Sequence, residues 1–184
     1  MSERNTLART AHDLGAAAWF GGSLMGAVGL NGATAQATSS PEALRLASVG
    51  WGRWAPVQTV AIAAHTLGGI GLIAGNRRRL EHQDEAQGNT AVKTVLTVAA
   101  VGLTAYSGSL GKQVYENRGD AVQGVTEPAS TTDSDLAAAQ KHLQWTQWAI
   151  PVVTGVLVVL GAQQGEQQRP SQQARVAVKN PLRR

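Results

Sequence analysis

Residues 61–79 read AIAAHTLGGIGLIAGNRRR, a stretch of small and apolar residues with one histidine that ends at three arginines. The interval without charged side chains around it runs from residue 54 to residue 76, a length of 23 residues. A helix needs about 20 mostly apolar residues to cross the hydrocarbon core of a bilayer. The stretch therefore predicts a transmembrane helix that stops at basic residues.

Three more long intervals of the 184-residue chain carry no charged side chain. They cover 14–41, 94–111 and 142–165, which are 28, 18 and 24 residues long. A surface helix of a soluble protein normally carries charges on its solvated face. Four long helices without charge therefore predict an all-α integral membrane four-helix bundle, although the mean hydropathy of −0.12 is low because the apolar intervals are rich in Ala, Gly and Thr.

The expected spans are 14–35, 55–75, 91–110 and 145–162, within a membrane domain of residues 1–165. The longest outer loop would cover 111–144, where Thr132 is the candidate N-cap of a helix that begins near Asp133 and continues into the last span. The polar and basic segment 166–184 is typical of a flexible cytoplasmic tail.

The distribution of Lys and Arg predicts the orientation, because cytoplasmic flanks carry the excess of basic residues. One side of the expected topology has 11 Lys and Arg and the other has 5, which places both termini in the cytoplasm (N-in/C-in) of a bacterial plasma membrane. The residues expected to anchor the spans at the two interfaces are Arg77, Arg78 and Arg79 inside and Trp51, Trp54, Trp145 and Trp148 outside. The alternative for the tryptophans is ordinary core packing.

The partner expected from this composition is the lipid bilayer. The net charge of +4 and the pI of about 10 would suit nucleic acid, but the basic run is short and acidic residues follow it directly, so no nucleic-acid partner is expected. A second alternative concerns residues 1–35, where Arg4, Arg9, an apolar stretch and the small residues ATA at 33–35 resemble a cleaved signal peptide. The apolar stretch is longer than such peptides use and follows Asp13, which favours a retained span.

Small residues predict close helix packing at two G-x-x-x-G pairs, formed by Gly22 with Gly26 and by Gly71 with Gly75. We expect packing within the chain, and a homo-oligomer face is the alternative.

His65 lies near the middle of the second expected span, and an ionisable group inside a membrane is a candidate functional site. Taking span midpoints places Ser23, His65 and Thr154 at about one depth, with Thr97 and Thr104 a turn on either side. The sequence therefore predicts a polar cluster at the midplane, in which a neutral His65 bonds to a hydroxyl. The cluster either holds helices together or serves a ligand or a proton.

Catalytic and metal motifs are missing from the sequence, which has no cysteine, no P-loop, no G-x-S-x-G and no H-E-x-x-H. We expect no enzyme activity, no metal and no cofactor. Haem held by two histidines is rejected because His12, His65 and His142 are expected at different depths and His82 in a loop.

Residues 11–22, AHDLGAAAWFGG, resemble the opening of the copper-resistance D-type four-helix membrane proteins at His12, Trp19, Gly21 and Gly22. The resemblance covers about twelve residues and implies a small helical bundle; the methionine and histidine ligands expected for copper do not follow. The leading expectation is a non-enzymatic accessory or scaffold subunit. The alternatives are a transporter or ligand-binding bundle around His65 and, third, a haem- or redox-associated membrane protein.

Overall fold

The computed structural model describes residues 6–77, 84–117, 119 and 121–167. Over these residues the regular structure is helical, apart from one isolated bridge between Val122 and Pro128. Two of the three arginines that end the second expected span, Arg78 and Arg79, lie outside the described residues, as does most of the expected tail.

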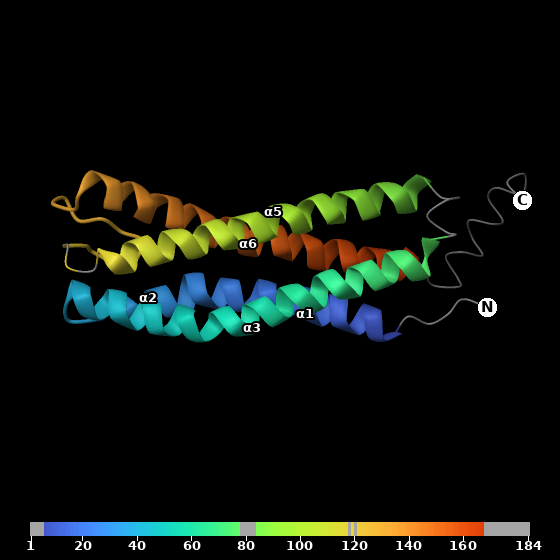
Figure 1. The fold of residues 1–184 in the computed structure, drawn as a ribbon, viewed down its shortest axis with the longest axis horizontal. Coiled ribbons are helices and arrows are strands. Elements are labelled where there is room, and N and C mark those ends of the chain that lie inside the picture. The colour runs from blue at the N-terminus through green and yellow to red at the C-terminus, as the bar shows by residue number, and fades with distance from the viewer. Residues whose placement is uncertain (1–5, 78–83, 118, 120, 168–184) are drawn as a thin grey trace, which may run out of the picture.

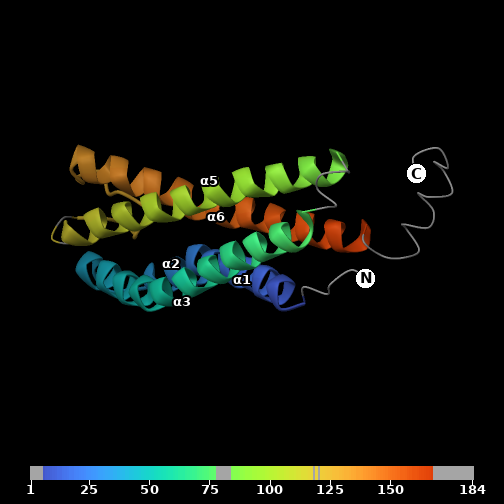
Figure 2. The ribbon, with the colours of Figure 1, turned by 45° about the vertical axis from the view of Figure 1, so that its right-hand side comes forward.

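The described helices form four long segments that lie side by side (Figure 1). The first consists of α1 (Thr6–Met25), the π-helical turn η1 (Gly26–Leu30) and α2 (Asn31–Thr34). The others are α3 (Ser40–Gly75), α5 (Asp84–Glu116) and α6 (Ser134–Gln167). Neighbouring segments run in opposite directions, as the second view confirms (Figure 2).

Two names describe the ends of the molecule. The terminal end is where α1 and α5 begin and α3 and α6 end, on the right in Figure 1. The hairpin end is where α2 passes into α3 and where the chain between α5 and α6 lies.

Three helices are long and apolar enough to cross a membrane: α3, residues Gln87–Glu116 of α5, and residues Ser134–Gly165 of α6. This agrees with a multi-pass membrane protein. The α1 helix is not among them, since it contains Arg9 and Asp13 and passes into the π-helical turn.

The helices are longer than the expected spans at the hairpin end. Residues 36–54, expected as a loop, are mostly the first four turns of α3, which begins at Ser40 and continues through Pro56. The charges in this segment misled the expectation, because Arg45 and Arg53 lie exposed and Glu42 partly exposed on the helix surface, where charge does not interrupt a helix. The α6 helix also starts at the hairpin end, at Ser134. Its N-cap is Asp133, whose Oδ1 accepts the backbone N–H of Asp135 at 2.9 Å.

Thr132, the expected cap of α6, has another role. Its hydroxyl donates to the carbonyl of Ala121 and accepts the backbone N–H of Ala129 at 2.8 Å. Thr132 therefore closes the loop that precedes the helix. A threonine next to an aspartate leaves the choice of cap open, because both residue types serve as N-caps.

The hairpin end has its own apolar core. It joins the start of α3, the end of α5, the start of α6 and the loop between the last two, through residues that include Leu44, Val114 and Leu143. Polar contacts hold the loop down: the Ser40 hydroxyl donates to the carbonyl of Val122 at 2.7 Å, and the Gln140 amide donates to two loop carbonyls. The chain thus forms a folded layer beyond the part that was expected to lie in the membrane.

Candidate functional site

Two glycines let α1 and α3 approach until their backbones touch. A Cβ atom on Gly15 would lie 2.5 Å from both the Ala61 carbonyl oxygen and the His65 backbone nitrogen. A Cβ atom on Gly68 would lie 2.5 Å from the His12 backbone nitrogen. These positions are closed to any larger residue, since normal carbon contacts lie near 3.5–4.0 Å.

This approach brings His12 and His65 together, a unit that we call the histidine pair. The two rings are stacked, with centroids 4.0 Å apart and planes 18° from parallel. Nδ1 of His12 lies 2.8 Å from the carbonyl oxygen of His65, and Nδ1 of His65 lies 3.1 Å from the carbonyl oxygen of His12. A carbonyl oxygen only accepts, so both rings carry a proton on Nδ1, and in the neutral form each keeps Nε2 as an acceptor.

A hydroxyl occupies one of these acceptors. The Thr97 hydroxyl of α5 donates to Nε2 of His65 at 3.1 Å, so the structure brings together His65 and one member of the expected polar cluster. The ring of Trp19, which is fully buried, meets His65 edge-on with centroids 6.2 Å apart. Residues from two other helices, α1 and α5, thus fix the orientation of the His65 ring on α3.

The sequence contains a signal for the pair that composition does not show. Residues 11–15 read AHDLG and residues 64–68 read AHTLG, so each helix offers a histidine three residues before a glycine. In two antiparallel helices, residues at this spacing meet symmetrically, because positions i and i+3 share one helix face. Each glycine then makes room for the backbone at the other motif's histidine.

The expected depths of the histidines are wrong. His12 was placed at the edge of its span and His65 at the centre, whereas the two lie in contact. The error comes from the bounds chosen for the first span. Residues 14–35 begin after His12, whereas His12 lies at the level of His65 in the middle of the second span.

The corrected depths do not supply a haem site between these two histidines. Axial ligands stand on opposite faces of the macrocycle, whereas the His12 and His65 rings are stacked at 4.0 Å and leave no space for it. Among the residues that the structure describes, no group of three His, Cys, Asp or Glu side chains is placed to hold a metal ion.

The other members of the expected midplane cluster have hydrogen-bond partners other than His65. Ser23 accepts a hydrogen bond from the Gln58 amide at 3.3 Å, and Thr104 accepts one from Nε1 of Trp19 at 3.3 Å. The Thr154 hydroxyl donates to the carbonyl of Ile150 in its own helix at 2.8 Å. Of the four expected hydroxyls, Thr97 is the one that bonds directly to His65.

Two of the four expected packing glycines, Gly22 and Gly26, do lie in the contact between the first segment and α3, where they meet tryptophan rings rather than backbone. Gly22 and Gly26 leave notches that the rings of Trp54 and Trp51 fill, because a Cβ atom at either glycine would overlap the ring. On α3, Gly71 faces the side chain of Ala8, at 3.1 Å from the position of a Cβ atom. Gly75 is exposed at the end of the helix.

The four expected anchor tryptophans fall into two groups. Trp51 and Trp54 are partly buried between α3 and the first segment, and Nε1 of Trp51 donates to the Asn31 side chain at 3.1 Å. Trp145 and Trp148 are exposed on α6, as residues at a lipid interface would be. Arg77, at the other end of α3, is also exposed.

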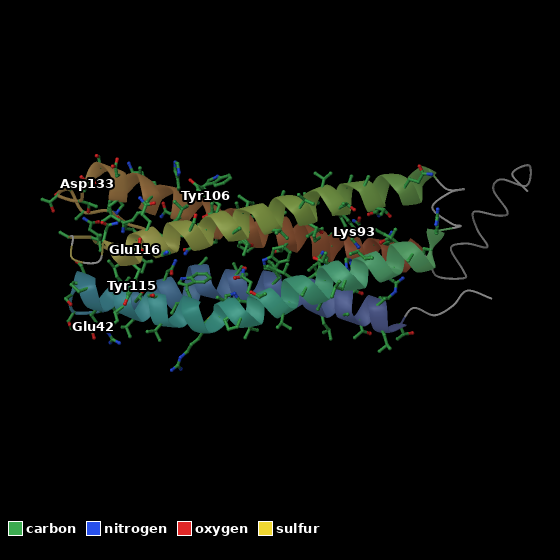
Figure 3. The ribbon with its side chains drawn as sticks, in the orientation of Figure 1. Glu42, Lys93, Tyr106, Tyr115, Glu116 and Asp133 are labelled. Atoms are coloured by element: carbon green, nitrogen blue, oxygen red, sulfur yellow. The ribbon has the colours of Figure 1, made fainter. Side chains whose placement is uncertain are left out.

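A cavity of about 210 Å³ lies between α3 and α5 beside the histidine pair, and we call it the histidine cavity. Its polar lining includes His12, His65, Thr97, Lys93 and Arg9. Its apolar lining includes Ile70, Ile73 and Val98, which are themselves exposed on the surface, so the cavity opens sideways between the two helices. Lys93 lies on the terminal half of α5 (Figure 3).

A second cavity of about 340 Å³ follows the same seam between α3 and α5 toward the hairpin end. Trp51, Gln58, Thr104 and Lys112 contribute to its lining. Between the two cavities, Trp19, Ala61 and Ala100 belong to an apolar core in the interior of the bundle.

No protein-family model, curated protein or solved structure matches this chain. The resemblance of residues 11–22 to the copper-resistance D-type proteins therefore stays a prediction.

Proposed function

We propose that this chain is a four-span integral membrane protein of a bacterial plasma membrane, with both ends in the cytoplasm, that binds a small amphipathic molecule in the histidine cavity. It does so without catalysing a reaction. The two parts of the proposal rest on different features of the helices.

The membrane part rests on two levels of charge with apolar surface between them. Toward the terminal end, Arg9 and Lys93 line the histidine cavity and Asp13 lies near Lys93, so these three charges are close to one level. Toward the hairpin end, Lys112 of α5 lines the second cavity. Lys93 and Lys112 are 19 positions apart on α5, which corresponds to about 28 Å at 1.5 Å per residue. This matches the roughly 30 Å thickness of the hydrocarbon core.

The surface between those levels has the composition that lipid requires. It exposes a series of large apolar side chains on three helices: Val57, Val60 and Leu67 on α3, Val95, Val98 and Val101 on α5, and Val152, Val156 and Val159 on α6. In water so much exposed apolar surface would be unfavourable. We count the first segment as the fourth span. Its polar His12 is buried against α3, so this side chain would not face lipid.

The binding part rests on one observation, the sideways opening of a cavity whose inner wall is polar and whose mouth is apolar. A ligand pocket typically combines apolar walls with a few placed polar groups. Here the polar groups are positioned by hydrogen bonds between helices, so they are preorganised. The preorganised polar groups favour a ligand-binding bundle over a scaffold subunit as the function of this chain.

A pocket-blocking substitution tests the binding part. Val98→Trp would fill the mouth of the cavity, whereas Val95→Trp places the same ring on the same helix outside it, and both valines are 68% exposed. We expect the wild-type protein and Val95→Trp to release a bound small molecule on solvent extraction of the detergent-purified protein, as measured by mass spectrometry. Val98→Trp should carry much less of it. Equal amounts in both variants, or none in the wild type, would refute binding in this cavity.

A scaffold or accessory subunit, alone or as a homo-oligomer, remains the second candidate. The folded layer at the hairpin end favours it, because a core built around Leu44, Val114 and Leu143 holds a loop in place beyond the proposed membrane level. Purification in mild detergent followed by native mass spectrometry tests this candidate. A complex of fixed stoichiometry would support it, and a monomer alone would count against it.

A further inference from the structure

We infer that the ligand of the histidine cavity is a single-chain anionic amphiphile of the fatty-acid class, with its carboxylate toward Lys93 and its chain leaving between α3 and α5. The inference rests on the proposed function and adds the chemistry of the ligand. Charge, hydrogen bonding and shape each contribute to it.

The charge of the lining is of one sign. Within the described part of the chain, the charged side chains that line the cavity are Arg9 and Lys93, both cationic. One acid close by is Asp13, whose Oδ1 approaches the same face of Gly161 as the Lys93 ammonium, at 3.8 and 4.0 Å from a Cβ atom placed there. The described charges of the lining itself are therefore cationic, with one carboxylate beside them.

Lys93 is poorly compensated by its neighbours. It is half-buried, and its ammonium donates to the Gln164 amide oxygen only at the long distance of 3.5 Å. Among the described residues no carboxylate lies within 4.0 Å of it. A cation near the hydrocarbon level is costly unless an opposite charge meets it, so an anionic group bound here would lower that cost.

Four neutral donors at the inner wall already have acceptors. The Thr97 hydroxyl donates to His65, and the Thr94 hydroxyl donates to the carbonyl of Thr90 at 2.8 Å. Both Nδ1 protons of the histidine pair bond to carbonyls of the opposite helix. We therefore assign the ammonium of Lys93 as the group that a ligand carboxylate meets.

The shape of the cavity selects one chain rather than two. Its volume of about 210 Å³ is below the range of roughly 300–1,000 Å³ that encloses a drug-sized ligand. The head group and the first part of one chain fit inside, and the rest of the chain lies outside between Ile70 and Val98, both exposed toward the expected lipid.

The experiment compares tetradecanoate with tetradecanol, which differ only in the head group. Equilibrium binding to the detergent-purified protein is measured with radiolabelled ligand near neutral pH, where a carboxylic acid is ionised and a lysine keeps its proton. We expect the acid to bind at least about tenfold more tightly, since a hydrogen bond to a charged group contributes about 1.5–3 kcal/mol. Lys93→Gln should remove this preference, Lys93→Arg should retain it, and Lys112→Gln, in the second cavity, should leave it unchanged.

Each outcome decides between the two levels of the proposal. Equal binding of acid and alcohol, or a preference that survives Lys93→Gln, overturns the inference but leaves ligand binding in place. Tighter binding of a two-chain anionic lipid, tested as phosphatidylglycerol, overturns the single-chain assignment. If no amphiphile binds wild-type protein of native helical content, the proposed function fails as well.

Discussion

Replacing Gly15 with alanine tests the contact on which the histidine pair depends. The added Cβ would lie 2.5 Å from two backbone atoms of α3, so the helices must separate by about 1 Å to restore ordinary contact. Overpacking of this kind costs about 1–3 kcal/mol. The separation would also stretch the bonds from the histidine rings to the opposite carbonyls, which are 2.8 and 3.1 Å long.

Gly21→Ala is the matched control, because nothing lies within 4 Å of a Cβ atom on Gly21. Alanine is favoured over glycine inside a helix by about 1 kcal/mol, so this variant should be as stable as wild type or more stable. We therefore expect the free energies of unfolding of the two variants to differ by about 1–3 kcal/mol. The assay is unfolding in mixed detergent micelles with increasing dodecyl sulfate, followed by circular dichroism.

Gly68→Ala should reproduce the loss, because it meets the backbone of α1 at the same distance of 2.5 Å. The double variant should lose less than the sum of the two losses, since the first substitution already moves the helices apart. If Gly15→Ala is as stable as Gly21→Ala, the close approach of α1 and α3 is wrong.

Three further results are expected. Thr97→Val removes the hydrogen bond to His65 and should lower the free energy of unfolding by about 0.6 kcal/mol, the average for such bonds in membranes; Thr94→Val, whose hydroxyl bonds within its own helix, should change it less, and the opposite order would contradict the assigned role of Thr97. A green fluorescent protein fused after Arg79 should fluoresce and an alkaline phosphatase fused there should be inactive, because this loop is proposed to be cytoplasmic; an active phosphatase would reverse the topology. Asp133→Ala should destabilise the start of α6 by about 1 kcal/mol while Asp133→Ser retains the cap, as hydrogen exchange of the first turn would measure; unchanged exchange in the alanine variant would exclude Asp133 as the cap.

The sequence predicts the class of fold from a single property, the absence of charge over long intervals. The intervals 54–76, 94–111 and 142–165 lie within α3, α5 and α6, which the structure shows to be long and apolar enough for a membrane. This works because lipid imposes the same requirement on every residue of a span, so that composition alone carries the signal.

Helix ends and helix register could not be predicted in the same way. Residues 36–54, which include Arg45 and Arg53, were expected as a loop, but α3 begins at Ser40 and includes both arginines, because an exposed helix face accepts charge. The register of α1 against α3 depends on which small residues touch. Gly15 and Gly68, rather than Gly22 and Gly71, are where the backbones meet.

The candidate site was predicted in part for the same reason. His65 attracted attention because histidine is rare inside a span, and the expectation of a hydroxyl partner agrees with its contact to Thr97. His12 was assigned to an edge because depth was read from span midpoints. The repeated AHxLG pattern at 11–15 and 64–68 is the local signal that would have paired the two histidines.

The register of α1 against α3 is the claim on which the histidine pair and its cavity depend, and disulfide trapping in membranes tests it directly. The chain has no cysteine of its own, so two introduced cysteines report one contact. Ala8→Cys with Gly71→Cys should form a disulfide, because the Ala8 Cβ lies 3.1 Å from a Cβ atom placed on Gly71, close to the 3.5–4.5 Å that the bond requires. Ala17→Cys with Gly71→Cys, which would be neighbours if Ser23 lay level with His65, should stay reduced; a disulfide in this second pair and none in the first would contradict the account.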